Sequence, residues 1–150
     1  MKGGLPMVEE QEMVSIDKKE LVGAAAELLA TGYRLVQIGC TTLADGYEMN
    51  YSFDRDYRFK NLRFTAKAGE EVPSISCIYW NAFLYENEIH DLFGIPITNI
   101  VIDYRGTLYR TRVPSPFALP EKPAGQEGGG GDKTGNTNQA SGAGNLHPES

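Results

Sequence analysis

Apolar positions recur at two different spacings along the chain, and the change of spacing predicts the order of helices and strands. In Asp17–Gly32 they recur every three to four residues, which is typical of a helix with one buried face. In Tyr33–Lys67 apolar and polar residues alternate, the pattern of half-buried strands. The helical spacing returns in Trp80–Ile95. This order predicts an α+β fold, in which an antiparallel meander sheet is covered on one face by two helices.

The first predicted helix has start and stop signals that agree. Asp17 can cap its N-terminus, and Glu20, three positions later, completes a capping box. Gly32 is expected at the C-terminal end, where a left-handed residue stops a helix. Ahead of this helix, Met13–Ile16 can form a short edge strand.

Three strands are expected after this helix. Tyr33–Leu43 leads into Asp45-Gly46, a dipeptide that favours a hairpin turn. Tyr47–Asp54 alternates cleanly between apolar and polar residues, as an antiparallel strand with one buried face does. Tyr57–Lys67 follows, and its alternation slips near Lys60-Asn61, which predicts a β-bulge there.

The second predicted helix carries carboxylates in an unfavourable place. When it is projected at about 100° per residue, the apolar side chains fall on one face, whereas Glu88 and Asp91 fall together on another. Two like charges at this spacing repel by about 0.2–0.5 kcal/mol. Both stand near Gly94, where the C-terminal end of the helix dipole disfavours anions. Unfavourable placements of charge in a helix often mark functional surfaces. We therefore expect these carboxylates to contact basic groups of a partner or to fix the turn at Gly94.

The segment after Gly94 shows neither a helical nor a strand period. Residues 96–120 combine β-branched residues and prolines with spaced aromatic and arginine residues. A long segment of this kind favours an extended arm that binds a partner. The candidate anchors in this arm are Tyr104, Arg105, Tyr109, Arg110, Arg112 and Phe117.

The C-terminal segment differs in composition from the rest of the chain. Residues 121–150 hold eight of the 17 glycines and no aromatic residue, and Leu146 is their only large aliphatic residue. Such a segment cannot bury enough apolar surface to offset its ordering entropy, so a flexible, disordered Gly-rich tail is expected. The predicted organisation is therefore an α+β domain at 12–95, the arm at 96–120 and the tail at 121–150.

Charge and apolar content restrict the partners and the location. The net charge of −6 argues against a nucleic-acid or anionic-membrane binder. No apolar run reaches membrane-spanning length, and the N-terminus MKGGLPMVEEQEMV lacks the apolar core of a signal peptide, so we expect a cytoplasmic location. Cys40 and Cys77 are the only cysteines, too few to hold an iron–sulfur cluster alone, and their apolar surroundings predict buried free thiols.

The sequence contains no signature of a stand-alone catalytic site. It has no GxSxG, P-loop or GxGxxG motif. Glu86 with His90, and Glu88 with Asp91, have spacings found in metal sites, but the two pairs point to different faces, and a di-metal bundle needs a second such helix. We therefore assign no catalytic, cofactor-binding or metal-ligating residue. A metal-dependent enzyme using these four residues and a soluble adaptor unrelated to redox chemistry stay as alternatives.

The second helix and its approach resemble a known family. The segment VPSI (Val72–Ile75), followed by Trp80, Ala82 and YENEIHDLFGI (Tyr85–Ile95), resembles the signature of the 30-kDa subunit family of respiratory complex I. That signature has the spacing E-x-E-x-x-D-x-F-G. The residues that match it are Glu86, Glu88, Asp91, Phe93 and Gly94.

Two departures from complex I members point to a different branch of the family. Asn87 stands where those members usually carry Arg, and PITNIVIDYRGTLYRTRVPSPF replaces their Gly-His-Pro and Leu-Arg-Arg segment. This ending is similar instead to the short D subunit of energy-converting, Ech-type membrane-bound nickel–iron hydrogenases. The equivalent subunits of complex I and of formate hydrogenlyase-type complexes stay as alternatives.

The resemblance implies a cofactor-free structural and assembly subunit in a cytoplasmic peripheral arm, at the inner face of the cell membrane. The implied partners are a nickel–iron large subunit, an iron–sulfur small subunit and, indirectly, membrane subunits. The nickel–iron centre and the iron–sulfur clusters would lie in those partners, which would pass electrons from ferredoxin to protons with coupled ion movement. Within this chain, the matched acids, Phe93 and Gly94 would join the arm in binding the large subunit.

Overall fold

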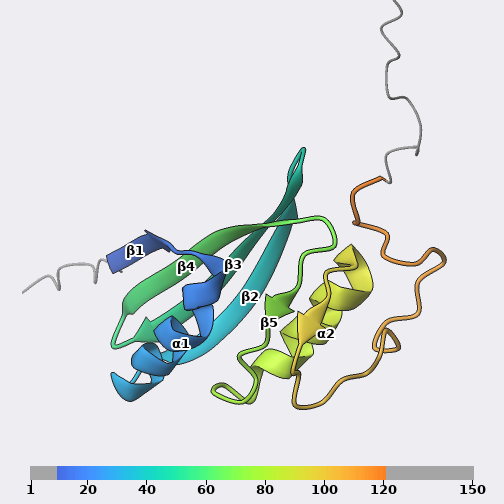
Figure 1. The fold of residues 1–150 in the computed structure, drawn as a ribbon. Helices are drawn as coiled ribbons and strands as arrows, with labels where there is room; N and C mark the ends of the chain where they lie inside the picture. Colours follow the sequence, from blue (N-terminus) through green and yellow to red (C-terminus); the bar gives the residue numbers. More distant parts are fainter. Residues whose placement is uncertain (1–9, 121–150) are drawn as a thin grey trace, which may run out of the picture. The chain divides into compact units, whose positions relative to one another are not determined.

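The computed structural model describes residues 10–120, so the segments 1–9 and 121–150, including the predicted Gly-rich tail, lie outside the described residues. The described chain has a four-stranded sheet in the order β1-β4-β3-β2, a two-stranded sheet of β5 and β6, and two α-helices (Figure 1). This confirms the predicted α+β architecture. The elements are β1 (Glu10–Ser15), a 3₁₀ turn η1 (Lys18–Glu20), α1 (Leu21–Ala30), β2 (Arg34–Thr42), β3 (Gly46–Arg55), β4 (Arg58–Lys67), β5 (Val72–Pro73), α2 (Ala82–Phe93) and β6 (Ile97–Thr98).

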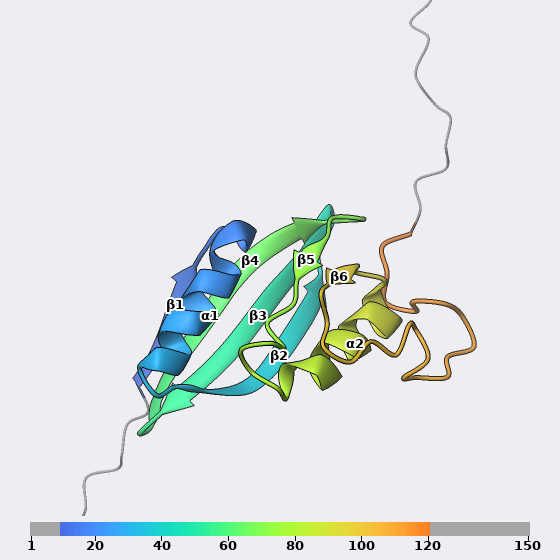
Figure 2. The ribbon, with the colours of Figure 1, turned by 60° about the horizontal axis from the view of Figure 1, so that its bottom comes forward.

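One face of the large sheet carries the hydrophobic core. Alternate side chains of β3 and β4 point to this face and are buried, as the period of two predicts. Figure 2 shows both helices on the same side of the sheet, with α1 near β1 and β4 and α2 near β2. The buried core comprises Leu35, Ile38, Tyr47, Met49, Tyr51, Phe53, Leu62, Phe64 and Ala66 from the sheet, with Leu21, Ala25 and Leu28 of α1 and Ala82 and Ile89 of α2 against them.

The ends of the first helix follow the predicted signals. The Asp17 carboxylate accepts a hydrogen bond from Lys19 N at 2.8 Å, and the Glu20 carboxylate accepts one from Asp17 N at 2.8 Å, which forms the capping box. The first turn is 3₁₀, and the α-helix follows from Leu21. At the other end Gly32 has a φ of 85°, the left-handed conformation that ends a helix.

The edge strand β1 is longer than predicted and pairs differently from the other strands. It runs parallel to β4, and Val14 lies opposite Leu62. The remaining pairs of this sheet, β2 with β3 and β3 with β4, are antiparallel. The sheet is therefore an antiparallel meander with one parallel strand added at its edge.

The predicted β-bulge near Lys60-Asn61 is wrong. β3 and β4 pair without a register shift, and a two-residue turn with positive φ at Asp56 (48°) and Tyr57 (65°) joins them. The alternation slips because Phe59 lies on the opposite face of the sheet from Leu62, as the strand period requires.

The irregularity lies in β2, where it faces α2. The register of β2 against β3 shifts between Leu35 and Gln37. The carbonyl of Leu35 accepts a hydrogen bond from Asn81 Nδ2 at 3.1 Å, and the carbonyl of Val36 accepts one from the Tyr85 hydroxyl at 2.9 Å. Side chains from α2 and its approach thus satisfy backbone groups of this strand, which is the edge opposite β1.

The two cysteines differ from the prediction of buried thiols. Cys77 is exposed and Cys40 is half-buried, and neither forms a disulfide within residues 10–120. Burial raises the pKa of the Cys40 thiol to about 12. That thiol is therefore protonated at neutral pH and a poor nucleophile.

Candidate functional site

Helix α2, its C-terminal cap Gly94 and the arm, residues 96–120, contain every residue predicted to bind a partner. The helix begins at Ala82, two positions after Trp80, and its C-terminal cap is Gly94 with a φ of 72°. Trp80 lies in the turn before the helix and is 60% exposed. The arm begins with β6, which pairs in parallel with β5 (Figure 1). After β6 the arm contains no further helix or strand among the described residues.

Glu86 lies inside the protein, which differs from its expected partner-facing position. Its side chain is 0% exposed. Its carboxylate accepts hydrogen bonds from Ser74 Oγ at 2.6 Å and from Ile75 N at 2.8 Å. Burial raises the pKa of Glu86, and these two hydrogen bonds oppose the rise. Glu86 therefore fixes the segment between β5 and α2, and its carboxylate binds Ser74 rather than His90.

A buried polar network continues from Glu86 to the arm. Ser74 Oγ and Ser76 Oγ lie 2.6 Å apart, and Ser76 Oγ accepts a hydrogen bond from Val101 N at 2.9 Å. The Tyr51 hydroxyl is buried beside this network and has no hydrogen-bond partner among the described residues. Burial raises the pKa of Tyr51, and the charge of Glu86 raises it further. The network connects the helix, the segment before it and the start of the arm.

Asn87 holds the next part of the arm. Its side-chain amide donates to the Ile102 carbonyl at 2.8 Å and to the Phe83 carbonyl of its own helix at 2.7 Å. Its Oδ1 accepts a hydrogen bond from Tyr104 N at 2.9 Å. Asn87 itself is almost completely buried, so its amide depends on these three bonds for its hydrogen-bond partners.

Asp91 stands one turn after Asn87 on the same side of α2 and holds the arm at a second point. Its Oδ2 accepts a hydrogen bond from Tyr109 N at 2.8 Å, while its Oδ1 lies 3.4 Å from His90 Nδ1. The carboxylate is almost fully buried. The expectation that Glu88 and Asp91 act as a pair is therefore not met by the geometry. Asp91 binds the arm of its own chain, whereas Glu88 is half-exposed and forms no hydrogen bond or ion pair within residues 10–120.

The end of α2 meets the arm through aromatic rings and a close backbone approach. Phe117 N donates to the Leu92 carbonyl at 2.8 Å, and the rings of Phe93 and Phe117 are 5.5 Å apart. Gly94 has a φ of 72°, a conformation that favours glycine, and a Cβ atom there would also lie only 3.0 Å from Ser115 Oγ.

The arm turns its predicted anchors outward while its backbone is bound to the helix. Tyr104, Tyr109 and Phe117 are 38%, 46% and 53% exposed. Arg105, Arg110 and Arg112 are exposed as well and form no ion pair in the described part of the chain. The structure thus combines a backbone held by hydrogen bonds with cationic and aromatic side chains that are exposed on the arm.

Sequence reasoning missed Ser74, Ser76 and Asn87, which carry much of this site. The two serines interrupt an apolar segment, and that interruption was a usable signal for buried hydrogen bonds. Asn87 was noticed only as a departure from a family pattern. An amide both donates and accepts, so it can bind the Ile102 carbonyl and the Tyr104 amide at once, which a guanidinium cannot do.

Within residues 10–120, no three His, Cys, Asp or Glu side chains converge as metal ligands would. The same part of the chain holds no helix whose length and apolar character would let it cross a bilayer.

One family model matches about two thirds of this chain. The model of the family described as "Respiratory-chain NADH dehydrogenase, 30 Kd subunit" matches residues 14–114. Among solved structures, a chain of the membrane-bound sulfane sulfur reductase, an archaeal respiratory membrane complex, has a similar fold with a TM-score of 0.58 and 15% sequence identity. That match covers 71% of this chain and 67% of the other chain. No curated protein gives a significant match.

Proposed function

Because this chain belongs to the respiratory-chain NADH dehydrogenase 30-kDa subunit family, we propose that it is a structural and assembly subunit of a membrane-bound respiratory complex. In the specific form of the proposal, the complex is an energy-converting, Ech-type hydrogenase. The chain carries no cofactor and docks on the nickel–iron large subunit, next to the iron–sulfur small subunit, on the cytoplasmic side. The similarity of residues 96–117 to the short hydrogenase paralogue supports this form.

The observation that carries the proposal is the attachment of the arm backbone to α2 by hydrogen bonds. Asn87, Asp91 and Leu92 bind the arm backbone at Tyr104, Tyr109 and Phe117. The arm backbone at these points is already held in place, so it needs little further ordering when the exposed side chains bind, and such preorganisation increases affinity. A fixed surface of this kind suits a permanent subunit contact.

The charge of the arm supports the same role. Residues 96–120 contain three arginines and one aspartate and no other charged residue, so the arm is positive within a chain whose net charge is −6. Arginine and large aromatic side chains are enriched in protein interfaces and dominate their binding energy. The matching surface on the large subunit is therefore expected to be acidic and partly apolar.

A second candidate is the equivalent subunit of a complex without a nickel–iron centre. The fold match to a chain of the sulfane sulfur reductase complex favours it. In that case the arginine and aromatic side chains of the arm would still bind the large subunit. Only the chemistry carried out by that subunit would differ from that of a hydrogenase.

Purification of the tagged full-length chain from its own cells tests both candidates. The hydrogenase form predicts a stoichiometric large subunit with two CxxC motifs, together with nickel in the purified complex. A co-purified large subunit that lacks those cysteines and nickel would favour the second candidate. A chain that purifies alone, with no respiratory subunit attached, would contradict the proposal in both forms.

A further inference from the structure

Three aromatic rings line up on the surface where α2 begins. The rings of Trp80 and Phe83 are 5.5 Å apart, and those of Phe83 and Tyr104 are 6.4 Å apart and close to parallel. This aromatic row (Trp80, Phe83 and Tyr104) joins the approach to the helix, the helix and the arm. Trp80 is the only tryptophan of the chain and is largely exposed. Leu84, exposed by 48%, extends the apolar surface along the helix.

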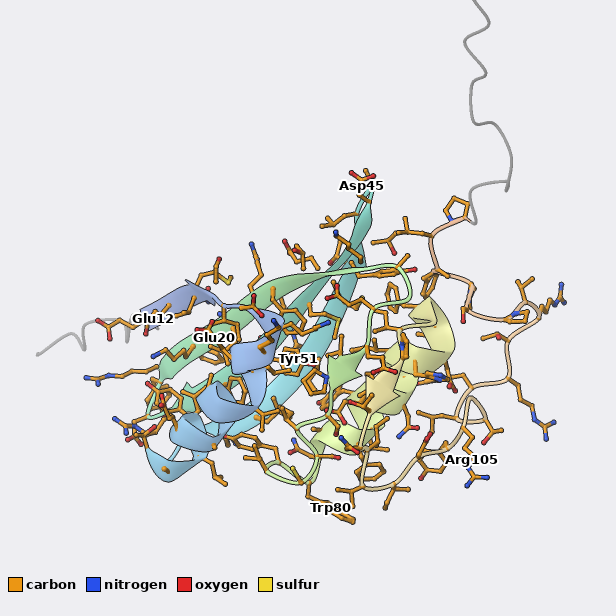
Figure 3. All side chains as sticks on the ribbon, viewed as in Figure 1. Glu12, Glu20, Asp45, Tyr51, Trp80 and Arg105 are labelled. Carbon is orange, nitrogen blue, oxygen red and sulfur yellow. The ribbon has the colours of Figure 1, made fainter. Side chains whose placement is uncertain are left out.

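A turn directly after Tyr104 carries a cation, Arg105. Arg105 has a φ of 52° and Gly106 one of 76°. Positive φ is uncommon for a residue with a side chain, so this conformation needs support from the surroundings. Here Asp103 Oδ1 accepts a hydrogen bond from Arg105 N at 2.8 Å, and Thr107 N donates to the Tyr104 carbonyl at 3.1 Å. Figure 3 shows Trp80 and Arg105 projecting outward along the same edge of the molecule.

We propose that the aromatic row and Arg105 together form a docking site for a segment of the large subunit that carries a carboxylate beside bulky apolar side chains. This inference rests on the proposed function and specifies where and how the partner binds. Tyr104 belongs to both the row and the arm, so the site continues the surface already proposed to face the large subunit. The apolar part of the segment packs on Trp80 and Leu84, and its carboxylate binds the Arg105 guanidinium.

Charge and composition favour this occupant. Arg105 forms no ion pair within the described residues, so its guanidinium is available for a bidentate carboxylate contact. Tryptophan and arginine are the residues most often found as hot spots, where one truncation removes much of the binding energy. The negative charge of the whole chain disfavours an anionic membrane as the occupant.

The test measures assembly of the full-length chain with the co-expressed large subunit. Trp80→Ala and Arg105→Glu should each weaken the association at least about 10-fold, the range of hot-spot truncations. Met13→Ala and Lys19→Glu are the controls, because the first removes an exposed apolar side chain and the second reverses an exposed positive charge, both outside the proposed surface. Both controls should assemble as the wild-type chain does. Thermal unfolding of each purified variant shows whether a loss of assembly comes from a destabilised fold instead of a lost contact.

The outcomes separate this inference from the function on which it rests. If the wild-type chain binds the large subunit and both site variants bind equally well, the docking site is wrong while the proposed function stands. If the wild-type chain does not bind the large subunit, the proposed function fails first. Arg105→Lys keeps the charge but loses the planar fork, so it should lie between Arg105→Glu and the wild type if a carboxylate is the partner group. Equal binding by the Lys and Glu variants would contradict that part of the proposal.

Discussion

The backbone amide of Tyr104 donates a hydrogen bond of 2.9 Å to Asn87 Oδ1, and this bond joins the start of the arm to the middle of α2. The same Asn87 side chain donates to the Ile102 carbonyl, two residues earlier in the arm. One buried amide thus fixes both a carbonyl and an amide of the arm backbone. The orientation of Arg105, the next residue, depends on this attachment.

Asn87→Asp tests the attachment with almost no change of shape. The variant removes both amide donor bonds and places a carboxylate against the carbonyls of Phe83 and Ile102. Leaving buried polar groups unpaired costs about 1–3 kcal/mol each, and more where a charge is involved. We expect the free energy of unfolding to fall by about 3 kcal/mol in urea titrations, with faster hydrogen exchange at the amides of residues 101–105.

Asn99→Asp is the matched control for this substitution. Asn99 is exposed in the same arm, and its side chain forms no hydrogen bond among the described residues. The same chemical change there should alter stability by less than about 0.5 kcal/mol. Equal effects at both positions would show that Asn87 does not hold the arm.

The secondary structure was largely predictable from the sequence because one face of each strand is buried. The alternation in Tyr47–Asp54 predicted β3 to within one residue at each end, and the Asp17 and Glu20 signals predicted the start of the first helix. The parallel pairing of β1 was not predictable in this way. It depends on a distant strand and leaves no mark in the local period.

The candidate site was less predictable, since its chemistry depends on which segments cover the helix. Angular projection correctly separated Glu86 from Glu88 and Asp91, but it could not show that Ser74 and Ile75 would enclose Glu86. It also could not show that the arm would return to Asp91. A helical projection identifies faces, whereas only the tertiary structure shows what packs on each face.

Asp91 and Glu88 are predicted to differ in their effect on stability, although both are acids of the same helix. Asp91→Ala removes the acceptor of the Tyr109 amide from a buried position, and we expect a loss of about 1–2 kcal/mol. Glu88→Ala should change stability by less than about 0.5 kcal/mol. Hydrogen exchange at the Tyr109 amide provides the local measurement, and slow exchange retained in Asp91→Ala would be the contrary result.

Two glycine-to-alanine substitutions should change the stability of the fold in opposite directions. Gly94→Ala places a Cβ 3.0 Å from Ser115 Oγ at a φ of 72°, so it should destabilise the chain by about 1–2 kcal/mol. Gly23→Ala lies within α1, where no atom comes within 4 Å of the added Cβ, and it should stabilise by about 0.5–1 kcal/mol. Thermal unfolding of both variants measures the difference, and a stabilised Gly94→Ala would refute the close approach.

Glu86 should make stability depend on pH in an unusual direction for a carboxylate. Burial raises its pKa in the folded state above the unfolded value of roughly 4.3. Between these two values the folded state binds more proton than the unfolded state, so this contribution to stability falls as the pH rises and is constant above the folded pKa.

Glu86→Gln isolates that contribution. The amide keeps the size of the side chain and an acceptor for Ile75 N, but it does not titrate. The difference in free energy of unfolding, wild type minus variant, should decrease as the pH is raised from 4 toward neutrality, an interval that begins near the ordinary Glu pKa of about 4.3. A difference that increases with pH over the same interval would mean that the hydrogen bonds of Glu86 outweigh its burial.

Site-specific photo-crosslinking in the assembled complex tests most directly whether the arm binds the large subunit. A photoreactive phenylalanine analogue at Tyr109 or Phe117 replaces an exposed aromatic side chain of the arm, and the same analogue at Tyr57, exposed in the β3–β4 turn, serves as the control. We predict crosslinks to the large subunit from both arm positions and none from Tyr57. Crosslinks from Tyr57 but from neither arm position would contradict the account.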